Sequence, residues 1–144
     1  MLNTGKPSFP DQCDADRKIP ANDFCRDFCI PVSQTQAGHS ALPDSFELNV
    51  GGVGVTGGLA ANTLCREADL VIGVGTRFND FVTGSKWVLF RNPDIKVLAI
   101  NTSEFHAEKL DAVRCVGDAK ATLEAIGRKL KKAGYKSGYT DEIQ

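Results

Sequence analysis

Residues 69–75 read DLVIGVG, an almost unbroken apolar run that ends at a glycine. A second run of this kind, KVLAIN, occupies residues 96–101. Apolar runs of this length, bounded by turn residues, are typical of parallel strands that are covered on both faces of a sheet. We therefore expect two adjacent parallel strands, with these side chains in the core: Val71, Ile72, Val74, Val97, Leu98 and Ile100.

Helical and extended patterns alternate on both sides of these two strands. Weaker strand patterns cover residues 31–36, 46–50 and 112–116. Helical spacing of apolar residues covers 21–29, 57–68 and 118–133, with Thr56 and Asp118 as the expected N-caps of the last two. This alternation predicts an α/β fold, a Rossmann-like parallel sheet flanked by helices.

Composition narrows the class of protein. The chain has 144 residues, 42% hydrophobic residues and a net charge of −1, which fits one globular domain and offers no basic surface for nucleic acid or an anionic membrane. It has neither an apolar run long enough to span a membrane nor an apolar N-terminal leader, so we expect a cytoplasmic protein. The predicted organisation is a polar tail or linker over 1–20, the Rossmann-like domain over 21–134, and a C-terminal linker over 135–144.

The five cysteines do not form a recognisable framework. Their odd number and wide spacing argue against disulfides. Cys25 and Cys29 share a helix face, but no second pair at ligand spacing completes a zinc site. We interpret the cysteines as small buried hydrophobes. A zinc site completed by Cys13 or His39 is the disfavoured alternative, so we predict no metal ligand and no catalytic residue.

Two glycine segments are candidates for nucleotide binding. Gly52, Gly54 and Gly57 fit the G-x-G-x-x-G pattern of a loop that wraps backbone amides around a pyrophosphate. The pattern is weak evidence here, because the preceding strand is doubtful and no acidic residue follows at the end of a second strand.

The second candidate lies where the 69–75 strand ends, the edge at which open α/β sheets place ligands. It contains Gly75, Arg77 and Asp80. Arg77 could bind a phosphate or carboxylate with Asp80 orienting it. An Arg–Asp pair that only shapes the corner explains the same residues equally well.

Several longer segments resemble one family. They are TQAGHSALP at 35–43, GGVGVTG at 51–57, ADLVIGVGTRFNDF at 68–81, INTSEFHAEKLDA at 100–112 and YKSGYTDEI at 135–143. Together they resemble the central domain of thiamine-diphosphate-dependent enzymes over roughly residues 21–144. Within that superfamily they are most similar to the hydrolases that open a cyclic 1,2-diketone in inositol catabolism.

The resemblance implies a scaffold rather than a catalyst. In this superfamily the central domain stands between the domains that hold thiamine diphosphate and Mg²⁺, and in some branches it binds FAD. The Gly-Asp-Gly motif for Mg²⁺ and diphosphate is not found; Gly117-Asp118-Ala119 is only close in letters. The resemblance thus implies a middle domain apart from its parent, with no cofactor of its own and other domains or subunits as partners. The alternative is a stand-alone FAD- or NAD-binding module.

One departure from the family concerns the start of the domain. Family members begin with a buried strand and a glycine loop, and residues 1–20 show no such strand. We therefore expect the first, central strand to be missing. Neighbouring strands would then have an open edge. That edge predicts a homo-oligomer, or an N-terminal segment that folds back to fill the gap.

Overall fold

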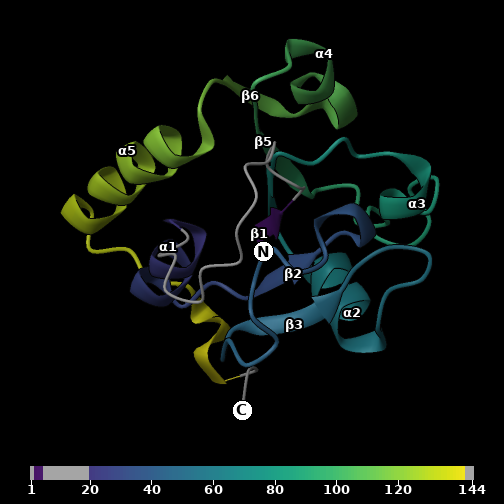
Figure 1. The fold of residues 1–144 in the computed structure, drawn as a ribbon, viewed down its shortest axis with the longest axis horizontal. Helices are drawn as coiled ribbons and strands as arrows, with labels where there is room; N and C mark the ends of the chain where they lie inside the picture. The colour runs from purple at the N-terminus through teal and green to yellow at the C-terminus, as the bar shows by residue number, and fades with distance from the viewer. Residues whose placement is uncertain (1, 5–19, 142–144) are drawn as a thin grey trace.

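The computed structural model describes residues 2–4 and 20–141, and at its centre lies one parallel sheet of six strands in the order β3-β2-β1-β4-β5-β6 (Figure 1). The strands are β1 (Leu2–Thr4), β2 (Val32–Gln34), β3 (Asn49–Gly52), β4 (Leu70–Val74), β5 (Lys96–Asn101) and β6 (Val113–Val116). The α-helices are α1 (Pro20–Phe28), α2 (Leu59–Glu67), α3 (Asp80–Thr83), α4 (Glu104–Ala107) and α5 (Ala119–Lys132). Short 3-10 helices are η1 (Gln36–Gly38), η2 (Lys109–Asp111) and η3 (Gly138–Asp141). The predicted fold class is confirmed.

The two strongest strand patterns form neighbouring strands of this sheet. β4 and β5 pair in parallel over five residue pairs, from Leu70 opposite Lys96 to Val74 opposite Ile100. Of the six side chains expected in the core, five are buried, and Leu98 is partly buried against the cluster that contains Ile72, Val74 and Ile100. The prediction from continuous apolar runs is confirmed.

The strand expected to be missing is present as β1. Leu2–Thr4 lies in the middle of the sheet and pairs in parallel with β2 on one side and with β4 on the other. The expectation that residues 1–20 contribute no strand is therefore wrong. The alternative, an N-terminal segment that fills the gap, is what the structure shows. Three residues suffice because the hydrogen bonds of a central strand come from both neighbours.

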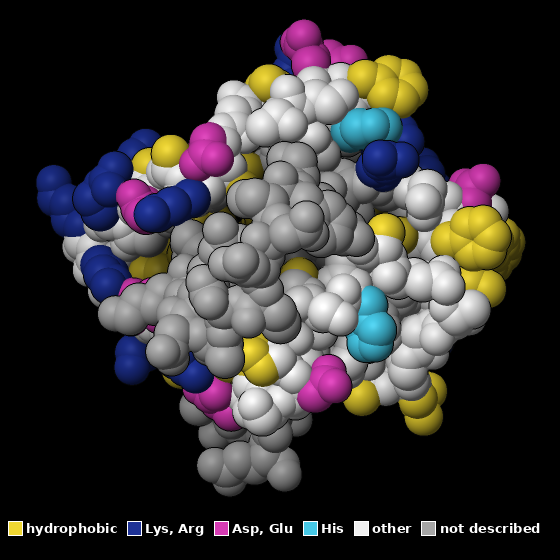
Figure 2. Space-filling view, in the orientation of Figure 1, with side chains coloured by type: hydrophobic (Ala, Val, Ile, Leu, Met, Phe, Trp, Pro, Cys, Tyr) yellow, Lys and Arg dark blue, Asp and Glu magenta, His cyan; other side chains and the backbone are white. Residues whose placement is uncertain are grey.

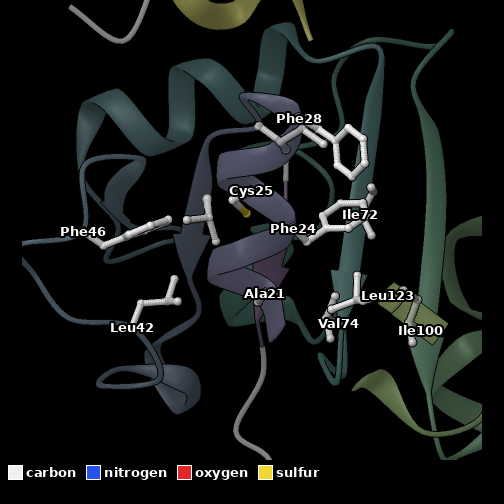
Figure 3. Packing of buried hydrophobic residues seen from close by; sticks show 12 residues of the cluster. Ala21, Phe24, Cys25, Phe28, Leu42, Phe46, Ile72, Val74, Ile100 and Leu123 are labelled. Atoms are coloured by element: carbon white, nitrogen blue, oxygen red, sulfur yellow. The ribbon is translucent and has the colours of Figure 1, made fainter. Parts of the chain in front are cut away.

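Helices α1 and α5 cover one face of the sheet (Figure 1). Phe24, Cys25 and Phe28 of α1 are buried over this face together with Ile72 of β4, as Figure 3 shows. The rings of Phe24 and Phe28 meet edge to face, with centroids 5.1 Å apart. The helical spacing of these aromatic residues is what places them on the sheet side of α1.

Helices α2 and α3 contribute to a second core on the opposite side of β4. This cluster contains Ala61 and Cys65 of α2, Val71 of β4, and Val82 of α3. Side chains of a strand alternate between faces, so Val71 packs here while Ile72 packs under α1. The sheet is thus covered on both faces, as its continuous apolar strands indicated.

Two predicted boundaries were misplaced. The strand expected at 46–50 begins only at Asn49, because Phe46 turns inward as a buried loop residue whose carbonyl accepts the N–H of Asn49 at 2.9 Å. The helix expected to start after Thr56 starts at Leu59, with Gly58 as its N-cap. Thr56 cannot cap it, since a turn closed by the N–H of Gly57 and the carbonyl of Gly54 comes first.

The C-terminal helix follows its prediction closely. Asp118 is the N-cap of α5, and its Oδ1 accepts the N–H of Ala121 at 2.9 Å. Beyond the helix, the N–H of Ser137 donates to the carbonyl of Phe28 at 2.8 Å, which ties the segment after α5 to the end of α1. No helix in the described part of the chain is long and apolar enough to cross a membrane.

Candidate functional site

The corner after β4 lies at the switch point of the sheet, where the connections from the two central strands diverge. This is the edge at which open α/β sheets bind ligands. Gly75 adopts a φ of +65° and donates its N–H to the carbonyl of Ile100 at 2.8 Å. Asn101 donates its side-chain amide to the carbonyl of Thr76 at 3.0 Å. The corner is therefore tied to the end of β5.

Phe78 holds the same corner from inside. It has a φ of +44°, a left-handed conformation that is strained for a bulky residue, yet its side chain is buried. Its ring lies against Gly73, where an added Cβ would come within 2.2 Å of Cζ, and meets the ring of Phe90 at 6.1 Å. This packing keeps the backbone in its strained form, and it leaves Arg77 on the outside.

Arg77 and Asp80 are both exposed. No ion pair joins them within residues 2–4 and 20–141, and the backbone carbonyl of Arg77 accepts a hydrogen bond from Lys109 Nζ at 3.0 Å. The Arg–Asp pair considered as an explanation of the corner is not formed. Among the described residues, no carboxylate pairs with the Arg77 guanidinium, which lies at the edge where open α/β sheets bind ligands.

The amides of the glycine loop are already engaged inside the protein. Gly54 N–H donates to Oδ1 of Asn62 at 3.0 Å, and Val55 N–H donates to the carbonyl of Phe81 at 2.8 Å. The N–H groups of Gly57 and Gly58 donate to carbonyls of the loop itself, each at 2.9 Å. A loop that cradles a pyrophosphate needs such groups free. The G-x-G-x-x-G pattern at 52–57 therefore lacks the amides its letters suggest, and it follows the edge strand β3.

Close packing explains two of the three motif glycines. A Cβ on Gly54, whose φ is +117°, would lie 2.3 Å from the carbonyl oxygen of Phe81. A Cβ on Gly57 would lie 2.6 Å from the carbonyl oxygen of Gly52. The structure thus brings the two glycine segments together, because the start of α3 rests on the glycine loop. The two glycine segments meet through close packing of their backbones.

Asn62 is the residue of this site that sequence reasoning missed. From α2, its side-chain amide accepts the N–H of Gly54 at 3.0 Å and donates to the carbonyl of Gly54 at 2.9 Å. One side chain thereby satisfies both main-chain groups of a glycine eight positions earlier. Only the spacing between a glycine turn and an amide on the next helix could have signalled it.

Comparison with known proteins decides the family. A family described as thiamine pyrophosphate (thiamine diphosphate) enzyme, central domain, matches residues 14–126. The chain belongs to this central-domain family. The predicted resemblance is confirmed.

Curated relatives of this central domain share one name. Proteins called 3D-(3,5/4)-trihydroxycyclohexane-1,2-dione hydrolase from Clostridium perfringens (strain ATCC 13124) and Clostridium botulinum (strain Alaska E43) are 53% and 54% identical to it over 121 residues. The match covers 84% of this chain and 19% of each relative. One from Bacillus anthracis (strain CDC 684) is 54% identical over 120 residues, which is 83% of this chain and 18% of the relative. The central domain thus spans about a fifth of their length.

The carboxylates of the described residues are not arranged as Mg²⁺ ligands. Oxygen ligands such as carboxylates are what Mg²⁺ requires. In the described ranges, no three His, Cys, Asp or Glu residues are grouped to hold a metal ion. The two histidine side chains of the chain lie apart on the face shown in Figure 2.

The cysteines of the described segments are free thiols. Cys25 of α1 and Cys65 of α2 are fully buried, while Cys29 and Cys115 are half-buried. Cys13 lies outside the described residues, so the disfavoured zinc site that includes it is not described. Burial of Cys25 and Cys65 agrees with their interpretation as small hydrophobes.

Burial of these two thiols predicts sensitivity to alkaline pH. Burial raises the pKa of Cys25 to about 12 and that of Cys65 to about 11, from an ordinary value of 9.0. Below pH 9 both thiols are neutral in the folded and unfolded chain, so they add no pH dependence. Above pH 9 the unfolded chain ionises first, and the free energy of unfolding falls. Between pH 8 and 10 we expect the two thiols together to cost about 3 kcal/mol.

Urea unfolding followed by circular dichroism, with reductant present, measures this effect. The control is the double variant Cys25→Ala/Cys65→Ala, which lacks both thiols but keeps every other titrating group. Its loss of stability between pH 8 and 10 should be smaller by the predicted amount. An equal loss in both proteins would contradict the prediction.

Proposed function

We propose that this chain serves as the non-catalytic middle domain of a cytoplasmic, homo-oligomeric thiamine-diphosphate-dependent hydrolase. The parent would act on a cyclic 1,2-diketone of inositol catabolism, and this domain would provide its scaffold and subunit interface. The observation that carries the proposal is 53% identity, over 84% of the chain, to a trihydroxycyclohexane-1,2-dione hydrolase. Thiamine diphosphate and Mg²⁺ would be held by other domains of the parent.

The geometry of the glycine loop supports a scaffold role. Its N–H groups at Gly54, Val55, Gly57 and Gly58 all bond within the protein. The buried residue among them, Gly54, has both main-chain groups bonded to Asn62, and a satisfied buried group favours one rigid arrangement. The loop therefore works as a packed joint between β3, α2 and α3.

The first test is binding of the parent's cofactor. We expect no heat of binding when thiamine diphosphate and Mg²⁺ are titrated into this chain, because its sequence lacks the Gly-Asp-Gly motif and no described residues are grouped as metal ligands. A full-length curated relative, titrated under the same conditions, serves as the positive control. Micromolar binding to this chain alone would overturn the proposal that other domains of the parent hold the cofactor.

A domain exchange tests the scaffold role directly. Residues 20–134 would replace the matching segment of the Clostridium perfringens relative. We expect the chimera to bind thiamine diphosphate and to open its substrate ring at a rate within about tenfold of the parent, since a scaffold contributes positioning alone. A chimera that folds and binds the cofactor but is inactive would refute a non-catalytic role.

A stand-alone nucleotide-binding module is the second candidate. The strand order favours it, since the switch point between β1 and β4 carries the exposed Arg77. The engaged amides of the glycine loop speak against it. We expect FAD and NAD to leave the melting temperature unchanged. Saturable stabilisation that Arg77→Ala weakens would favour this second function.

A further inference from the structure

β6 is the last strand of the sheet, and within the described part of the chain it pairs with β5 alone. It joins β5 in parallel, from Leu98 opposite Val113 to Asn101 opposite Val116. Among the described residues no strand lies beyond it. Figure 1 shows β6 at the top of the sheet, between α5 and α4.

The hydrogen-bonding direction of β6 follows from its last bond to β5. The N–H of Gly117 donates to the carbonyl of Asn101 at 3.0 Å. Alternate residues of a strand direct their main-chain groups to the same side. Val113, Cys115 and Gly117 therefore face β5, while the N–H and C=O groups of Arg114 and Val116 face outward.

The side chains of β6 leave this edge open as well. Val113 is 67% exposed and Val116 is 52% exposed. Edge strands usually carry charged side chains, proline or a bulge that blocks further pairing. β6 has no proline and no bulge, and its one charged side chain, Arg114, is engaged by Glu104 and Glu108. The opposite edge differs, since β3 has a register shift against β2 and a φ of +91° at Gly51. The β6 edge is therefore the more regular of the two edges.

We propose that β6 pairs antiparallel with β6 of a second copy of this chain, across a two-fold axis at Cys115. Arg114 then lies opposite Val116 of the second copy, and the two exchange both main-chain hydrogen bonds. Cys115 lies opposite Cys115 of the second copy as the non-hydrogen-bonded pair between them. This pairing gives the subunit interface of the proposed function a definite surface, and in that respect it rests on the proposed function.

The charges on the edge suit this register. Arg114 meets a valine across the axis, so no like charges face each other, which would be unfavourable in opposed pairs. Its guanidinium is also paired within its own chain, because Nη1 contacts the carboxylates of Glu104 on α4 and of Glu108 directly after it. The pairing satisfies the outward main-chain groups of both copies and covers the two exposed valines.

Sedimentation of the whole chain provides the first test. We expect the average mass to rise from 15.5 kDa toward twice that value as concentration rises to ~0.5 mM, the range suited to a small interface. Val116→Pro should abolish this rise, because it removes an outward N–H and leaves the bonds to β5 intact. Val116→Ala keeps the N–H and should still associate, and circular dichroism verifies that both variants are folded.

Oxidative cross-linking tests the register without relying on the proline variant. In a Cys13→Ser/Cys29→Ser background, copper–phenanthroline should join two chains through Cys115, since such pairs have Cα atoms about 4.5 Å apart, within reach of a disulfide. Moving the thiol with Val113→Cys/Cys115→Ser should remove the cross-link, because residue 113 lies opposite residue 117.

Three results would overturn the proposal. They are a monomer at every concentration, association that Val116→Pro leaves unchanged, or a cross-link as strong from position 113 as from 115. The domain exchange described above measures cofactor binding and ring opening by the chimera, and neither readout requires this chain to pair through β6 on its own. A failure of the strand pairing is therefore distinguishable from a failure of the scaffold role.

Discussion

Replacing Gly54 with alanine is expected to destabilise the domain by about 3–5 kcal/mol, a large share of the ~5–15 kcal/mol typical of a domain. The added Cβ would lie 2.3 Å from the carbonyl oxygen of Phe81, a backbone atom that no side-chain rotation can move. The φ of +117° adds strain for any residue with a side chain. Relieving the clash would break the bond from Val55 to Phe81 and the two bonds to Asn62.

Gly58 offers the matched control in the same loop. It has a φ of −72° as the N-cap of α2, and a Cβ there meets nothing within 4 Å. Gly58→Ser should therefore gain a few tenths of a kcal/mol, because serine is the better N-cap. Urea unfolding followed by circular dichroism compares the variants. If Gly54→Ala were as stable as the parent and lost only nucleotide binding, the glycine would serve a ligand instead.

Ile72→Asp is expected to unfold the domain outright. Ile72 is 5% exposed, lies between β1 and β5 in the sheet, and packs in the core under α1. The substitution removes a large apolar side chain, worth about 2–5 kcal/mol, and buries a carboxylate with no partner. The two penalties together exceed the stability of a typical domain of this size.

Two variants calibrate this result. Leu70→Asp places the same charge on the same face of β4, but Leu70 is 38% exposed, so water can solvate the carboxylate. We expect a loss of about 1 kcal/mol there. Ile72→Val should cost 0.5–1.5 kcal/mol, roughly the value of one methyl group. A folded Ile72→Asp variant with a cooperative melt would show that the sheet centre admits water.

The strands and helices of the second half were predictable because their signals are local. The strand at 69–75 is indicated by its continuous apolar residues. Helix α5 is indicated by its helical spacing of apolar residues and by the N-cap Asp118. Both signals come from the segment itself. The family resemblance added the domain type, which periodicity alone does not contain.

β1 escaped prediction because its signal lies in other segments. Leu-Asn-Thr is neither a continuous apolar run nor a clear alternation. Its place in the sheet comes from β2 and β4, which offer main-chain partners on both sides. A three-residue strand is specified by the strands on either side of it. A pattern search over its own few residues cannot detect those neighbours.

The position of the candidate site could be predicted from the sequence, but what its residues do could not. The corner after β4 was correctly placed at the end of a strand, and Arg77 is exposed there as a ligand-binding residue would be. The letters of 52–57 could not show that Phe81 and Asn62 would occupy the loop's amides. Those contacts depend on tertiary approach between residues eight and 26 positions apart.

β1 has a consequence for how the molecule forms. It is the element through which the β3-β2 ladder and the β4-β5-β6 ladder become a single sheet. Its partner on one side, Ile72, stands 70 positions from Leu2 along the chain. Closing so long a loop costs entropy before any contact repays it, and such topology slows folding. The two ladders can assemble locally, and they become one sheet only when residues 2–4 lie between β2 and β4.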